Sequence, residues 1–187
     1  DELGPLFLNV PTFDTIAKLI SRYANESSIL DVILRILLFI KSVDLDCAMR
    51  IQTHFLEVYS RLIEEHIEEV ETVTMVMDLA AAMTEHTEAC VDAFPHFMPV
   101  ILSCGEKYAA NAEVTELFAK ILFHVSKQAS VVAQLYEAKV VQLLVARLAK
   151  YAEMKEEVIR YYICALSYIM VDDETTRYDF KDVEGVN

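Results

Sequence analysis

The sequence predicts an all-helical protein built from repeated helical units, and three observations support this prediction. The chain has 187 residues, of which 55% are apolar, which is enough for one domain with its own core. It contains only three glycines and four prolines, so few residues can form hairpins and tight turns. Similar segments also recur at long intervals: RYANESSIL from Arg22, KYAANAEV from Lys107 and KYAEMKEEV from Lys150. Such repetition is typical of stacked helical units.

One long helix per unit is predicted from apolar residues at helical spacing. The segment EVTELFAKILFHVS, with Val114, Phe118 and Leu122 on one stripe, matches EVIRYYICALSYIM at a distance of 44 residues. A similar stripe begins at Ile29, and TVTMVMDLAAAM, which ends at Met83, fills the slot between. We therefore treat residues 1–187 as a single domain and expect the third helix of each unit near residues 28–42, 70–85, 112–126 and 156–171.

A medium-length second helix is expected ahead of each long helix. These second helices open at VPTF from Val10, FLEV from Phe55, MPVI from Met98 and VVQL from Val140, and the Phe55 unit is degenerate. Pro11 and Pro99 are expected in a first turn, where a missing N–H has no partner within the helix. Asn111 and Ser28 are expected as N-caps of the long helices that follow.

A short first helix completes the unit, as in TEACVDAF from Thr87 and SVVAQLYEA from Ser130. Cys47 and Cys90 fall at the position of Val132 in this helix, which predicts that the cysteines are small core residues. The cysteines form no CxxC pair and no cluster with histidine. We therefore expect reduced thiols in a cytoplasmic or nuclear protein, and no structural zinc site.

A unit of about 42 to 44 residues with a short, a medium and a long helix resembles the armadillo repeat, and two-helix HEAT units share this period. NAEVTELFAKILFHVS resembles the third helix of the family, and YEAKVVQLL from Tyr136 resembles the run that joins its first and second helices. The resemblance implies a right-handed α-solenoid of about four armadillo-like three-helix repeats. The glycine usual between the first two helices is absent from YEAKVV and AFPHFMP, which leaves HEAT-like geometry open.

The resemblance also implies a binding groove. In nuclear-import members, a Trp and an Asn four residues later project from each third helix into the concave groove and hold an extended peptide. The chain has no tryptophan, and none of the equivalent positions is an asparagine, so recognition of nuclear-localisation signals is not implied. A groove that binds a protein or peptide partner is still implied, with Phe39, His124 and Tyr168 projecting into it. Its expected residues are Arg35, Phe39, Asp78, Lys120, His124, Cys164 and Tyr168.

The net charge of −14 argues against a general phosphate-binding surface and suits a basic partner. A nucleic-acid binder is a minor alternative, which would require an exposed basic stripe around Lys120, Lys127, Arg147 and Lys150. The longest apolar stretch, ILDVILRILLFI, contains Asp31 and Arg35. These charges are expected to pair at i and i+4 on an exposed helix face, so no membrane span is expected.

Known catalytic motifs are absent from the sequence. The five histidines form no HExxH or ExxH pair, and no GxGxxG, GxxxxGK[ST] or GxSxG motif occurs. His66 and His86, with acids nearby, would make at most an adventitious metal site. We therefore expect no enzyme activity, no cofactor and no metal. The alternative is a closed helical bundle with a small-ligand or metal site formed by inward-facing Glu and His.

The leading hypothesis is a non-catalytic scaffold for protein–protein interaction. The opening DELGPLF without an initiator methionine leads us to expect a fragment or a processed chain. A positive mean hydropathy indicates that some apolar surface is covered by further repeats, by a homodimer contact or by a bound partner. The last segment, TTRYDFKDVEGVN, is expected to begin another unit or a cap.

Overall fold

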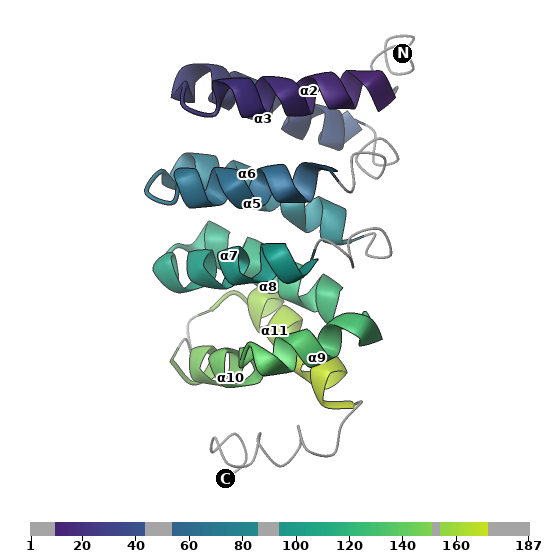
Figure 1. Cartoon of the computed structure of the whole chain (residues 1–187). Helices are drawn as coiled ribbons and strands as arrows, with labels where there is room; N and C mark the ends of the chain where they lie inside the picture. The colour runs from purple at the N-terminus through teal and green to yellow at the C-terminus, as the bar shows by residue number, and fades with distance from the viewer. Residues whose placement is uncertain (1–9, 44–53, 86–93, 151–153, 172–187) are drawn as a thin grey trace.

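The structure is a computed structural model that describes residues 10–43, 54–85, 94–150 and 154–171. Within these ranges the regular elements are all helices, so the all-helical prediction is confirmed. The helices lie in successive layers, and the first and last described layers lie at opposite ends of the stack (Figure 1). All of TEACVDAF except its last residue, Phe94, lies outside the described residues, as do TTRYDFKDVEGVN, Cys47, Cys90 and His86.

Four long helices form one row along the stack, which we call the long-helix row. Each packs on the next, α3 on α6, α6 on α8 and α8 on α11. Their bounds lie within one residue of the four ranges expected from the sequence. They are α3 (Ser27–Val43), α6 (Val70–Thr84), α8 (Ala112–Ser126) and α11 (Glu156–Val171).

The remaining helices cover the other side of the core (Figure 1). Helix α2 packs on α5, and α5 packs on α7. The last layer contains a third helix, α9, which is joined to α10 at Lys139 with a bend of 72° between the two helices. The bounds are α2 (Val10–Tyr23), α5 (His54–Glu65), α7 (Phe94–Lys107), α9 (Ala129–Glu137) and α10 (Val140–Lys150).

The apolar stripes of the long helices form a core that is continuous from layer to layer. In α8, Val114, Phe118 and Leu122 are fully buried, as the spacing predicts. Cys104 of α7 is also buried, and its thiol lies 3.2 Å from the sulfur of Met77. The predicted core role of the cysteines is thus confirmed at Cys104, while Cys164 is only half-buried.

The N-cap of α8 has the predicted geometry. The Asn111 side-chain oxygen accepts hydrogen bonds from the backbone N–H groups of Glu113 and Val114, each at 3.0 Å. The corresponding prediction for Ser28 is wrong, because α3 begins at Ser27 and Ser28 therefore lies inside the first turn. The cap matters for the groove described below, since it fixes the position from which Glu113 projects.

The start of α7 also differs from the prediction. Pro99 was expected in a first turn, but the helix begins at Phe94, so that Pro95 occupies the first turn and Pro99 lies inside. Phe94 and Phe97 are both buried. Burial of two aromatic side chains offsets the backbone hydrogen bond that Pro99 cannot donate, and so extends the helix toward its N-terminus.

Adjacent layers are joined by hydrogen bonds whose two partners lie nearly the same number of residues apart. Each runs from a side chain of one layer to a backbone carbonyl of the layer before it, with sequence separations of 41 or 42 residues. The pairs are His66 Nε2 with Ala24 at 2.7 Å, Tyr108 Oη with Ile67 at 2.5 Å, and Arg147 with Gly105. Tyr108 belongs to KYAANAEV, so this recurring segment contributes to the joint between layers.

Arg147 of α10 is a buried charge at the junction of four helices, with 5% of its surface exposed. Its guanidinium donates to the Gly105 carbonyl of α7 and, at 3.0 Å, to the Tyr162 hydroxyl of α11. The guanidinium also lies 4.6 Å from the centre of the Phe118 ring of α8. The cation–π contact and two acceptors replace much of the hydration that burial removes.

No single described helix has both the length and the apolar composition needed to cross a membrane. The bent pair α9 and α10 meets that criterion only when its two helices are counted together.

Candidate partner-binding groove

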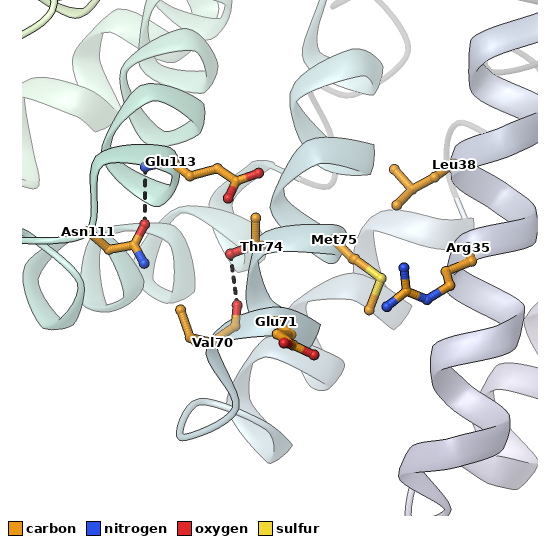
Figure 2. A pocket seen from close by; sticks show the side chains of 8 residues that line it. All are labelled: Arg35, Leu38, Val70, Glu71, Thr74, Met75, Asn111 and Glu113. Carbon is orange, nitrogen blue, oxygen red and sulfur yellow. Dashed lines mark hydrogen bonds between the residues drawn. The ribbon is translucent and has the colours of Figure 1, made fainter.

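A groove runs along the surface of the long-helix row. Its first hollow, of about 270 Å³, lies between α3, α6 and the start of α8 (Figure 2). A second hollow, of about 510 Å³, lies between α6, α8 and the residues before α11. Glu113 lines both hollows, so they adjoin. We call the two together the long-helix groove, lined by Arg35, Leu38, Val70, Glu71, Thr74, Met75, Asp78, Asn111, Ala112, Glu113, Glu116, Leu117 and Lys155.

The groove has an apolar floor between polar walls. Leu38, Met75 and Leu117 are half-buried and come from three successive long helices. Figure 2 shows Arg35 of α3 pointing toward Met75 of α6, with Glu113 pointing from the start of α8 toward the same space. A floor of this kind gives an incoming side chain an apolar contact, while the walls give it charge.

Four carboxylates line the groove, and two of them have cationic partners. The Lys41 ammonium donates to Asp78 at 2.6 Å, and Lys155 donates to Glu116 at 2.6 Å. The hydrogen bond from Lys155 to Glu116, followed by their charge interaction, raises the pKa of Lys155. Both pairs join adjacent layers, so they hold the walls of the groove at a defined separation.

The other two carboxylates, Glu71 and Glu113, are exposed and have no ion-pair partner within the described part of the chain. Arg35, which lies nearby, pairs instead with Asp31 at 2.8 Å on the same helix, as the sequence predicted. The hydrogen bond to Asp31 is the main reason that the pKa of Arg35 is raised. The groove therefore presents two exposed carboxylates above an apolar floor, and each interacts at longer range with a cation, Glu71 with Arg35 and Glu113 with Lys155.

Only some of the residues that were predicted to line a groove do so in the structure. Arg35 and Asp78 line the long-helix groove, whereas Lys120 lines neither hollow and has its ammonium 3.6 Å from Glu85. Cys164 is half-buried on α11. Phe39 and Tyr168 are exposed, with 69% and 44% of their surface accessible, but neither lines the two hollows.

His124 does not project from the surface, contrary to the expectation. Only 5% of it is exposed, and its ring packs on that of Phe123, with 5.2 Å between ring centres. Burial of this position varies along the long-helix row. Ala82 at the same place in α6 is also 5% exposed, whereas Phe39 in α3 and Tyr168 in α11 are 69% and 44% exposed.

The carboxylates that distinguish the groove were not predicted from the sequence. A signal was present, because Glu71, Glu113 and Glu157 each lie in the first turn of a long helix, at intervals close to the repeat period. An aromatic cluster on α8 and α11 was not predicted either. The Phe123 ring lies 5.3 Å from that of Tyr161 and 6.2 Å from that of Tyr168.

Other candidate chemistry does not assemble in the described residues. No group of three or more His, Cys, Asp or Glu side chains there could hold a metal ion. His66 is buried between layers, where its ring contacts Glu69 at 3.0 Å and the Ala24 carbonyl at 2.7 Å. Arg147 is buried as well, so an exposed basic stripe through this residue is not formed. The Lys150 side chain lies outside the described residues.

Comparisons of the chain with protein-family models, curated proteins and solved structures give no match. The geometry of the groove is therefore the basis of the function proposed below.

Proposed function

We propose that the chain is a non-catalytic scaffold that binds a partner protein or peptide in the long-helix groove. The observation that carries the proposal is the pair of adjoining hollows over three long helices, with an apolar floor and two exposed carboxylates, Glu71 and Glu113. Surfaces that combine apolar contact with a few oriented polar groups are typical of protein recognition sites. The compartment that we propose is the cytoplasm or the nucleus, in keeping with the free thiol of Cys104.

We further propose that the fold is an armadillo-like, right-handed α-solenoid. Three features support it: the long helices stack in one row, the hydrogen bonds between layers each join residues 41 or 42 positions apart, and the last layer contains three helices. A closed bundle would instead place its carboxylates and histidines inward. A solenoid provides an extended binding surface, because each layer contacts its neighbours alone.

The partner that fits best is an extended segment with basic residues. A Lys or Arg side chain placed in the first hollow would lie near Glu71 and Glu113, while its aliphatic stem would contact Leu38 and Met75. The spacing of the two hollows favours a peptide over a small ligand, because one continuous occupant could contact both. Nucleic acid is disfavoured, since its phosphates would meet carboxylates here.

A selection from a random peptide library tests the proposal, followed by titration of the selected peptides against the whole chain. We expect enrichment of Lys and Arg, and binding that weakens as salt is added. The double variant Glu71→Gln, Glu113→Gln should weaken binding about tenfold at low salt, since exposed ion pairs contribute about 0.2–1 kcal/mol each. The matched control Glu137→Gln, an exposed acid on α9, should change nothing. Selected peptides that lack basic residues, or that bind the double variant equally well, would refute the assignment.

A further inference from the structure

Helix α3 carries an apolar stripe that is exposed to an extent unusual for large hydrophobic side chains. Val32, Ile36 and Phe39 lie at i, i+4 and i+7, and their exposed fractions are 55%, 50% and 69%. Leu34 and Leu37 on the same helix are fully buried. Exposed apolar residues are common singly, but a contiguous stripe of three marks an interaction surface.

The stripe faces away from the next layer. Leu38 and Lys41 are on the side of α3 that meets α6, as the groove lining and the ion pair with Asp78 show. A helix turns by about 100° per residue, so Ile36 lies about 160° from Leu38 around the axis. The stripe, which we call the first end face, is therefore the outer side of the first described layer.

The positions of the first end face have counterparts inside the stack. Moving along the sequence by 129 residues, or three periods, takes Val32 to Tyr161, Ile36 to Ala165 and Phe39 to Tyr168. In α11 these positions pack on the preceding long helix: Tyr161 and Tyr168 contact Phe123, and Ala165 is fully buried. The first end face thus has the pattern of a surface that packs on another long helix.

The other end of the stack has the complementary pattern. On α11, Ile163 is 54% exposed and lies about 160° around the axis from Tyr161, which faces α8. Ile159 and Met170 lie on the same side and are half-buried. We call these three residues the second end face. The α3 counterpart of Ile163 is Leu34, which faces α6 and is fully buried.

We propose that copies of this chain associate end to end, with the second end face of one copy packed on the first end face of the next. A second copy is the occupant that the pattern favours, because each face has the register of a junction already present within the stack. The charged residues next to the two end faces are consistent with this contact. At the junction of α8 and α11, Glu116 pairs with Lys155. The counterparts at the proposed junction are Arg160 and Glu26, both exposed and again opposite in sign.

The two faces differ, so the contact is heterologous. A heterologous contact adds copies without a fixed limit unless the rotation closes a ring. We therefore expect the average mass to rise beyond that of a dimer as the protein concentration increases. A symmetric contact of α3 with α3 would instead stop at two copies.

Sedimentation velocity of the whole chain across a wide concentration range tests the proposal. The variants Ile36→Asp and Ile163→Asp each place a carboxylate on one end face, at positions exposed enough to leave the fold unchanged by circular dichroism. We expect association of each variant alone to fall by roughly 100-fold or more, since an unpaired charge would be buried. An equimolar mixture should form a 1:1 complex and nothing larger, because it contains one intact pair of faces. Ser103→Asp, which places a carboxylate at an exposed site on α7 in an inner layer, is the matched control and should associate normally.

Several outcomes would overturn the proposal. The wild-type chain could remain monomeric at all concentrations, or Ile163→Asp alone could still form dimers, which would indicate symmetric α3 contacts. Association that appears only after removal of residues 1–9 or 172–187 would show that these segments, and not a second copy, cover the faces. Charge exchange gives a separate check: Arg160→Glu should weaken association, and Glu26→Arg in the same chain should restore it.

Discussion

Gly105 of α7 approaches the ring of Phe118 on α8 so closely that a methyl group has no space there. A Cβ atom added to Gly105 would lie 2.6 Å from Cδ2 and Cε2 of Phe118 and 2.9 Å from Cζ. Favourable contacts between carbon atoms lie at about 3.5–4.0 Å. The ring cannot easily move away, because it is fully buried and is flanked by Arg147 and Tyr162.

The substitution Gly105→Ala should therefore lower the free energy of unfolding, although alanine is the better helix former. Helix propensity alone would stabilise α7 by about 0.5–1 kcal/mol. Overpacking a well-filled core costs about 1–3 kcal/mol, and a shift of α7 would also strain the bond from Arg147 to the Gly105 carbonyl. We expect a net loss of about 2 kcal/mol, or about 4–8 °C in Tm for a chain of this length.

Urea and thermal unfolding, followed by circular dichroism, measure this effect. The control is a double-mutant cycle with Phe118→Leu, which removes the atoms that the new methyl group would meet. In the Phe118→Leu background, Gly105→Ala should be neutral or stabilising, so the two substitutions should show a coupling energy of about 1–3 kcal/mol. A rise in Tm for Gly105→Ala alone would contradict the close approach of α7 and α8.

Three further predictions concern the joints and the core. Lys139, at the bend between α9 and α10, has a φ of 58°, a backbone conformation that glycine adopts more easily than lysine. Lys139→Gly should therefore raise the free energy of unfolding, measured by urea titration, by about 0.5–1 kcal/mol. A lower free energy of unfolding would contradict this backbone conformation. The hydrogen bond with His66 lowers the pKa of Glu69, so its contribution to stability is full above the ordinary pKa near 4.5 and declines as pH falls below that value. Glu69→Gln should flatten this part of the stability curve, and an unchanged curve would argue against the bond. Burial raises the pKa of the Cys104 thiol to about 12, so in a chain with serine at positions 47 and 90, Cys104 should react with a thiol reagent at pH 8 far more slowly than Cys164.

The long helices could be predicted from sequence because their determinants are local. The stripe that begins at Val114 repeats with the helical period, and Asn111 caps the helix that contains it. The residues that pack against a helix from other layers are not determined by its local sequence. Position 124 was predicted to be exposed because its neighbours in sequence do not reveal how closely the fold packs around it, and the structure leaves only 5% of it exposed. Arg147 looked like surface for a similar reason, since its acceptors come from two other helices.

The groove was partly predictable. Arg35 and Asp78 were found because a repeat register carries from one layer to the next. Glu71 and Glu113 were missed, although they follow the same register, because acids in a first turn are commonly explained by the helix dipole alone. Their second role depends on the gap between helices, and the width of that gap is a tertiary property.

Arg147 has a consequence for how the stack comes apart. If α7 unfolded alone, this guanidinium would lose its contact with Gly105 while still enclosed by α8 and α11. Leaving a buried charge with fewer acceptors is costly enough to couple the unfolding of α7 to that of the last layer. The last two layers should therefore unfold as one cooperative block, with matched protection against hydrogen exchange, while the first layer, joined through neutral carbonyls and surface ion pairs, opens at lower free energy.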